Sequence, residues 1–312
     1  MRMIADRSTL TLRSLAWLQL LVLAGGLVSP MVVGAETAGR IAYLALTEGT
    51  WQVWVASPDG DEASLVTRSA GDKIHCSWDP DGRTLLVSRL DSVPIRVDVA
   101  TGRETPLSIP FSNVVDAVVS PDGSRIAFSA IPADTVDSNE IWLAKADGTA
   151  VRRITDMPFL QHQPAWSPDG RWLYFLSSKG GKEDPAHDVW RVAIDGTSRE
   201  QITAGALYQF EVAVSPTGAL AYSSNRSGNY EIWVERENAA PVPVTEHPAL
   251  DSEPAWSPDG RSLLFTSTRG GVPNLWRVVP GEGGEGAPIQ ITHTRGGARA
   301  AAWWRSPRED GR

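Results

Sequence analysis

The sequence predicts an all-β protein, a six-bladed β-propeller whose blades are four-stranded antiparallel sheets. Three observations predict it. A proline-centred turn recurs at spacings of 41, 47, 48 and 42 residues, a tryptophan recurs at one place in the repeat, and the 312 residues include 28 Gly and 22 Pro. A repeat of about 45 residues that holds four short strands is typical of a propeller blade.

The recurring turn is Ser-Pro-Asp-Gly or a near copy of it. Proline presets φ at the second turn position, and glycine supplies a left-handed residue, so each copy is expected to join two antiparallel strands. We assign these strands as the innermost and second strands of a blade. The five copies are Asp79–Gly82, Ser120–Gly123, Ser167–Gly170, Ser215–Gly218 and Ser257–Gly260.

Each turn is followed by an apolar second strand and then by a third strand that carries the tryptophan. A tight turn such as Asp147-Gly148 then leads to the fourth strand, and Asp-Gly between apolar runs is a strong hairpin signal. We expect the repeated tryptophans to pack blade against blade rather than to bind a ligand. The third-strand tryptophans are Trp54, Trp142, Trp190, Trp233 and Trp276.

The count of strands predicts how the propeller closes. The chain enters the repeat at a second strand, 41–44, and ends at an innermost one, 300–304. We therefore expect the C-terminal strand to complete the N-terminal blade, which gives six blades and removes an exposed sheet edge. The predicted propeller spans 36–306, and 307–312 is expected to be a disordered tail.

The first 35 residues have the pattern of a signal peptide. Arg2, Arg7 and Arg13 precede an apolar stretch at 15–28, and small residues lead to a cleavage point after Ala35. The predicted location is therefore the periplasm or the exterior. The alternative is an uncleaved membrane anchor, which would be the chain's one contact with a membrane.

The charge and the cysteine content exclude a basic nucleic-acid-binding surface and sites built from several cysteines. The net charge of −8 leaves no basic footprint for nucleic acid. Cys76 is the single cysteine, so an intrachain disulfide and a cysteine-rich zinc site are both excluded. We expect Cys76 to be a small buried residue, because it takes the place that proline has in other copies of the repeat.

The segment 253–276, EPAWSPDGRSLLFTSTRGGVPNLW, resembles the WD40-like (PD40) repeat of the TolB propeller family. The resemblance covers about 40–304 and implies an exported propeller. In that family the propeller binds the peptidoglycan-associated lipoprotein Pal, and an N-terminal α/β domain serves the TolA side of the Tol–Pal system. We expect this chain to lack that domain, because five residues separate Ala35 from the first strand. Similar repeats also occur in prolyl-oligopeptidase-type peptidases and oligogalacturonate lyases.

The predicted binding site is the mouth of the central channel. The residues that open the innermost strands should form a ring there, on the face that also carries the long insertions 132–139 and 179–188. The ring is predicted to contain His75, Asp116, Gln163, Glu211 and Glu253, with Ala300 as its sixth member. Candidate outer contacts at the ends of the second strands are Arg89, Lys179, Arg226 and Arg269. The structural alternative is that the ring residues hydrogen-bond the backbone of a neighbouring blade.

We expect a non-catalytic protein that binds a cell-envelope protein, such as a Pal-like lipoprotein, through this face. No catalytic residue, metal ligand or cofactor is predicted, since Gly-x-Ser-x-Gly, His-x-His and His-Glu-x-x-His patterns are absent. The alternative function is a hydrolase or lyase that acts on a saccharide. In that version the carboxylates and His75 would act as acid and base, or would hold a divalent cation at the channel mouth.

Overall fold

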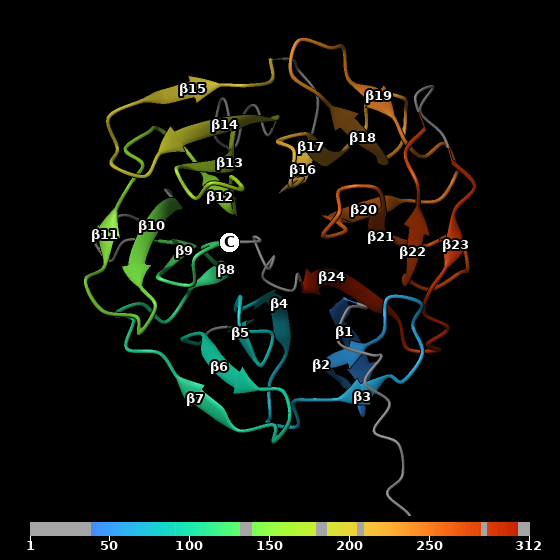
Figure 1. Cartoon of the computed structure of the whole chain (residues 1–312), viewed down its shortest axis with the longest axis horizontal. Coiled ribbons are helices and arrows are strands. Elements are labelled where there is room, and N and C mark those ends of the chain that lie inside the picture. Colours follow the sequence, from blue (N-terminus) through green and yellow to red (C-terminus); the bar gives the residue numbers. More distant parts are fainter. Residues whose placement is uncertain are drawn as a thin grey trace, which may run out of the picture. The chain divides into compact units, whose positions relative to one another are not determined.

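The computed structural model describes residues 39–90, 92–131, 139–178, 186–204, 209–281 and 286–304. This part of the chain is entirely β-strand, turn and loop, and no helix in it could cross a membrane. Its 24 strands form six four-stranded sheets. Figure 1 shows the sheets as blades around a central axis, which confirms the predicted six-bladed propeller.

The blades follow one another in chain order, and the strands of each are named from the innermost outward. Blade 1 contains β24 (Ala298–Trp304), β1 (Arg40–Thr47), β2 (Thr50–Ala56) and β3 (Ser64–Leu65). Blade 2 contains β4 (Lys73–Trp78), β5 (Thr84–Arg89), β6 (Ile95–Asp98) and β7 (Glu104–Pro106). Blade 3 contains β8 (Val115–Val119), β9 (Arg125–Ala130), β10 (Glu140–Lys145) and β11 (Arg152–Arg153). Blade 4 contains β12 (Gln161–Trp166), β13 (Trp172–Ser178), β14 (His187–Ala193) and β15 (Arg199–Gln201). Blade 5 contains β16 (Gln209–Val214), β17 (Leu220–Ser224), β18 (Glu231–Glu235) and β19 (Val242–Pro243). Blade 6 contains β20 (Asp251–Trp256), β21 (Leu263–Ser267), β22 (Asn274–Val278) and β23 (Ile289–Gln290).

The closure of the ring is as predicted. Strand β24 pairs antiparallel with β1, with Arg40 opposite Trp304 and Ile41 opposite Trp303. The last described strand is therefore the innermost strand of the blade to which the first belongs. This pairing leaves no blade without an innermost strand, and it joins segments about 260 residues apart in the chain.

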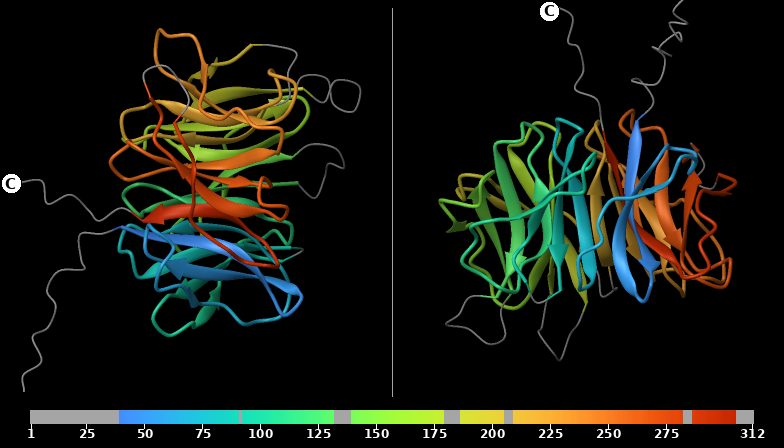
Figure 2. Two further views of the ribbon diagram at one scale, coloured as in Figure 1. Left: turned by 90° about the vertical axis from the view of Figure 1, so that its right-hand side faces the viewer. Right: turned by 90° about the horizontal axis from the view of Figure 1, so that it is seen from below.

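The strands run between two faces of the propeller, which Figure 2 shows edge-on. We call the face where the innermost strands begin the ring face, and the face with the Pro-Asp-Gly turns the turn face. The turns are held by their own side chains, because the Ser hydroxyl donates to the Asp carboxylate at 2.6 Å in the copies at 120, 167 and 257. In the blade 5 copy Thr217 replaces the Asp, and its hydroxyl lies 3.0 Å from that of Ser215.

The apolar core lies between adjacent blades. The second strands are its most buried part, with Phe128, Phe175 and Phe265 fully buried. The third-strand tryptophans pack blade against blade as predicted: Trp54 packs against a cluster that includes Leu275 of blade 6, and Trp190 against one that includes Ile141 of blade 3. Two tryptophans of innermost strands also bridge blades, because the indole N–H of Trp78 donates to the carbonyl of Ala302 in blade 1, and that of Trp166 to the carbonyl of Val118 in blade 3. Burial of one large apolar side chain contributes about 1.5–3 kcal/mol.

Two local expectations need correction. The innermost strands begin one or two residues before the ring positions, and a β-bulge or register shift interrupts each of them. The insertion predicted to reach residue 188 ends sooner, since His187 already lies in β14 and pairs with Ser178. The remainder of that insertion, and most of the one at 132–139, lies outside the described residues.

Candidate functional site

The predicted ring residues line the central channel, whose volume is about 470 Å³. Four of them and Ala300 share one backbone feature, a left-handed φ of 52–54° at the bulge of the innermost strand. Such a φ is uncommon for residues other than glycine and costs about 1 kcal/mol or more unless the surroundings hold it. The four are Asp116, Gln163, Glu211 and Glu253. Its recurrence at five equivalent positions indicates that the surroundings supply a common compensating contact.

That contact is a chain of hydrogen bonds from blade to blade. The backbone N–H of Glu211 donates to Oε1 of Gln163 at 2.9 Å, and the N–H of Glu253 donates to Oε2 of Glu211 at 2.9 Å. The N–H of Ala300 donates to Oε2 of Glu253 at 2.8 Å. The Asp116 carboxylate likewise accepts from the backbone of Gln163. Each side chain therefore holds the bulge of the next blade, as the structural alternative for the ring expects.

The carboxylates of the ring are held a second time by hydroxyl groups of their own blades. The hydroxyl of Ser223 donates to Glu211 at 3.1 Å, and that of Thr266 donates to Glu253 at 2.7 Å. Both bonds go to Oε2, the oxygen that already serves the neighbouring blade. Among the described residues, Oε1 of Glu211 accepts no hydrogen bond. Within the described part of the chain, this carboxylate therefore uses one oxygen for the joint between blades and leaves the other without a hydrogen-bond donor.

Burial and mutual repulsion change the ionisation of these groups. Burial, together with the charge of Glu253, raises the pKa of Glu211 to about 7. Burial also raises the pKa of Asp116 and lowers the pKa of His75, whose imidazole hydrogen-bonds the backbone of Ala117. The mouth is therefore least negative at acidic pH and gains negative charge as the pH rises through neutrality.

Arg299 belongs to the mouth and was missed by the repeat alignment. Its Nη1 donates to Oε1 of Glu253 at 3.2 Å, and its guanidinium lies 5.1 Å from the ring centroid of Trp51. It directly precedes Ala300, the one ring position without a polar side chain. The available signal was that Arg299 is the one charged residue among the six that precede the ring positions.

The described outer arginines lie against their own blades rather than forming a free basic ring. Arg89 donates to the carbonyl of Val93 at 3.2 Å. Arg226 lies over the ring of Trp233 at 4.7 Å and donates to the hydroxyl of Tyr222 at 3.1 Å. Arg269 forms a 2.6 Å ion pair with Asp251, whose side chain is fully buried. Lys179 lies outside the described residues.

Two histidines also lie near the ring face. The imidazoles of His162 and His187 meet edge-on, with ring centroids 4.8 Å apart. Burial and the neighbouring His187 lower the pKa of His162 to about 4. Among the residues that the structure describes, no group of three or more His, Cys, Asp and Glu side chains is placed to hold a metal ion.

With this geometry in view, comparison with known proteins identifies the family. Residues 35–232 match the family model described as the TolB beta propeller domain. The chain belongs to the TolB β-propeller family. The fold and family predicted from the sequence are thereby confirmed.

The similarity extends to curated and solved members of the TolB family. The chain is 30% identical over 140 residues to the Tol-Pal system protein TolB of Anaeromyxobacter dehalogenans (strain 2CP-C), a match that covers 41% of this chain and 30% of that protein. The chain thus spans about a third of the length of the curated TolB relatives it matches. The crystal structure of TolB from Acinetobacter baumannii matches with a TM-score of 0.73 and 22% identity, over 85% of this chain and 66% of that one.

Propellers of enzymes share the fold as well. An oligogalacturonate lyase in complex with manganese matches with a TM-score of 0.55 and 18% identity, over 78% of this chain and 86% of that one. This likeness concerns the fold alone, because one propeller scaffold serves binding proteins and enzymes.

Proposed function

We propose that this propeller is a non-catalytic adaptor of the bacterial cell envelope, which binds a protein partner through its ring face and channel mouth. The observation that carries the proposal is the match of residues 35–232 to the TolB propeller domain. The curated relatives are proteins of the Tol-Pal system, so a Pal-like lipoprotein is the proposed partner. The proposed location is the periplasm, after cleavage near Ala35.

The geometry of the mouth supports a protein partner. The carboxylates of Glu211 and Glu253 are each fixed by a backbone donor from the next blade and a hydroxyl donor from their own blade. Fixed polar groups lose little entropy when a partner binds. The mouth contains both an acceptor, Oε1 of Glu211, and a cationic donor, Arg299. One inserted segment could therefore donate a hydrogen bond to Glu211 and accept one from Arg299.

The test must separate binding from folding, because the ring residues hold the blades together. Asp116→Asn, Glu211→Gln and Glu253→Gln, combined, keep an oxygen acceptor at each position for the next blade's backbone but remove the charge. We would immobilise residues 36–312 as wild type and as this variant, pass a detergent-solubilised envelope extract over both, and identify what is retained. The matched control replaces three exposed acidic residues near the turn face, Asp61, Glu62 and Asp147, by the corresponding amides.

The proposal expects one lipoprotein to be retained by the wild type and the control and lost by the ring variant. Retention of no specific protein by the wild type would contradict the adaptor role. Equal retention by wild type and ring variant would leave an adaptor that uses another surface, and would remove the ring from the site.

A further inference from the structure

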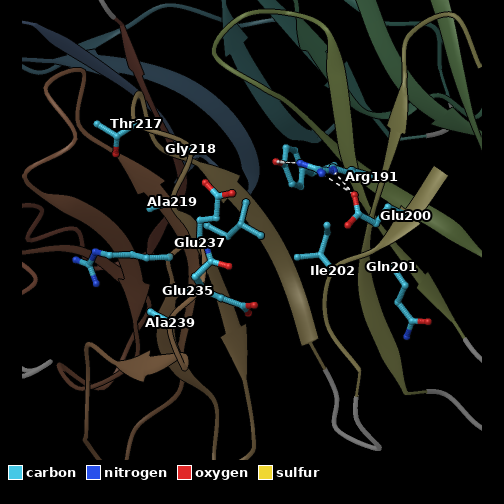
Figure 3. Close-up of a pocket in the computed structure, with 14 residues that line it drawn as sticks. Arg191, Glu200, Gln201, Ile202, Thr217, Gly218, Ala219, Glu235, Glu237 and Ala239 are labelled. Carbon is cyan, nitrogen blue, oxygen red and sulfur yellow. Dashed lines mark hydrogen bonds and ion pairs between the residues drawn. The ribbon is translucent and has the colours of Figure 1, made fainter. Parts of the chain in front are cut away.

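A second hollow, which we call the interblade cleft, lies between blades 4 and 5 towards the turn face. Its volume is about 870 Å³, larger than that of the central channel. Figure 3 shows Arg191 and Glu200 of blade 4 on one side and Glu235 and Glu237 of blade 5 on the other. Ile202 and Leu220 contribute apolar lining.

The cleft lies at a junction where the Pro-Asp-Gly-type turns of two neighbouring blades do not touch, although they do at other junctions. A methyl group on Gly123 or Gly260 would lie 3.4 or 3.3 Å from the turn proline of the preceding blade, which shows that these turns stack. The corresponding distance for Gly170 is 3.7 Å. The same methyl on Gly218, in the turn of blade 5, would meet no atom within 4 Å. The turn of blade 5 therefore does not stack on the turn of blade 4.

The sequence departs from the repeat at the same place. Blade 5 has Thr217 where the turns of blades 2, 3, 4 and 6 have Asp, and its third-to-fourth turn contains no glycine. At that second turn, Gly60 of blade 1 and Gly148 of blade 3 approach the preceding blade so closely that a methyl would lie 2.1 or 3.0 Å from its backbone. Blade 5 has Asn238 and Ala239 there, and side chains at that separation would clash.

The charges of the cleft favour a cationic ligand. On the blade 4 side, Arg191 and Glu200 neutralise one another, since Nη2 and Nε of Arg191 lie 2.5 and 2.9 Å from the same carboxylate oxygen. The blade 5 side carries Glu235 and Glu237 against one arginine, the exposed Arg236. The five charged side chains of the lining are therefore two basic and three acidic, beside apolar surface from Ile202 and Ala239.

We propose that the interblade cleft is a second binding site, which takes an extended segment of a partner protein in which lysine or arginine alternates with aliphatic residues. The cation lies between Glu235 and Glu237, and the aliphatic residues lie against Ile202 and Ala239. The site is on a different part of the propeller from the channel mouth, so it stands whether or not the mouth binds a partner.

The test uses a fluorescent peptide, Ala-Leu-Lys-Val-Lys-Ala, and a matched peptide with Glu in place of both Lys. Fluorescence anisotropy would be measured with the folded protein and with Glu235→Gln/Glu237→Gln, which keeps an acceptor for the hydroxyl of Tyr222 at position 235. The control is Glu48→Gln/Glu246→Gln, which removes the same charge from two exposed positions elsewhere on the propeller. Thermal melts would confirm that the three proteins are equally folded.

We expect saturable binding of the lysine peptide, about tenfold weaker binding by the cleft variant, and unchanged binding by the control. The glutamate peptide should not bind. Absence of saturable binding would overturn the proposal. Equal weakening in the cleft variant and the control would also overturn it, because binding would then follow net charge alone.

Discussion

The backbone N–H of Glu253 in blade 6 lies 2.9 Å from Oε2 of Glu211 in blade 5 and donates a hydrogen bond to it. The carboxylate is thus part of the joint between two blades as well as part of the channel mouth. Because Oε2 forms this joint, a substitution that keeps an oxygen acceptor at position 211 should spare stability, whereas one that removes it should not.

Glu211→Ala should destabilise the propeller, whereas Glu211→Gln should be tolerated. Alanine leaves the N–H of Glu253 and the hydroxyl of Ser223 without their acceptor, which costs about 1–3 kcal/mol. Glutamine keeps an oxygen for both donors. Chemical denaturation monitored by tryptophan fluorescence gives both free energies of unfolding. Equal values for the two variants would show that the hydrogen bonds to Glu211 contribute nothing measurable.

Stability should fall as the pH rises from about 4.5 to about 7, through the contribution of Glu211. Its pKa is raised from 4.5 to about 7 by folding, so in this range the folded state binds more protons than the unfolded state. The contribution is fully present below pH 4.5 and is lost as the pH passes 7. Subtracting the melting temperatures of Glu211→Gln from those of the wild type at each pH isolates it, because the other titrating groups are common to both. A difference that is flat with pH would contradict the raised pKa.

Removal of strand β24 should abolish cooperative folding. A chain that ends at residue 297 loses the innermost strand of blade 1 and exposes the edge of β1 along Arg40–Ala45. Circular dichroism during heating would show a broad transition or none. A chain that ends at residue 304 keeps all 24 strands and serves as the control, with an expected melting temperature equal to that of the full chain. A sharp transition in the shorter chain would show that blade 1 is stable without its closing strand.

Cys76 should not react with a thiol reagent until the protein unfolds. The residue is 2% exposed, and burial, with the charge of Glu253, raises the pKa of its thiol to about 12. Release of the coloured product from Ellman's reagent should be negligible in buffer and stoichiometric in denaturant. Rapid reaction in buffer would mean that the innermost strand of blade 2 opens locally.

The sequence predicted the architecture because the repeat signals are local and redundant. The Pro-Asp-Gly turns and the third-strand tryptophans each recur five times, and the strand count with the last strand, 300–304, set the total of six blades and the closure. What the sequence could not show is how neighbouring blades contact one another. The hydrogen bond from Glu253 to Glu211 joins residues 42 positions apart and depends on a bulge that no propensity indicates.

Two residues of the described sites, Arg299 and Thr217, depart from the repeat. The repeat places Ala300 at the ring position, whereas the charged side chain that lines the channel in blade 1 belongs to its neighbour Arg299. Thr217 was visible as a departure from the repeat, but its link to the cleft depends on the loss of a turn contact between blades. A departure from the repeat marks a residue as unusual, but the contacts between blades decide which cavity that residue lines.

The pairing of Arg40 with Trp304 places the first and last described strands next to each other at one edge of blade 1. Both residues lie at the turn face, since β24 runs there from the ring position at Ala300, and the described chain enters and leaves the fold side by side. A tether joined to the propeller at residue 39 or residue 304 would therefore approach it from the turn face, and the ring face would point away from the point of attachment.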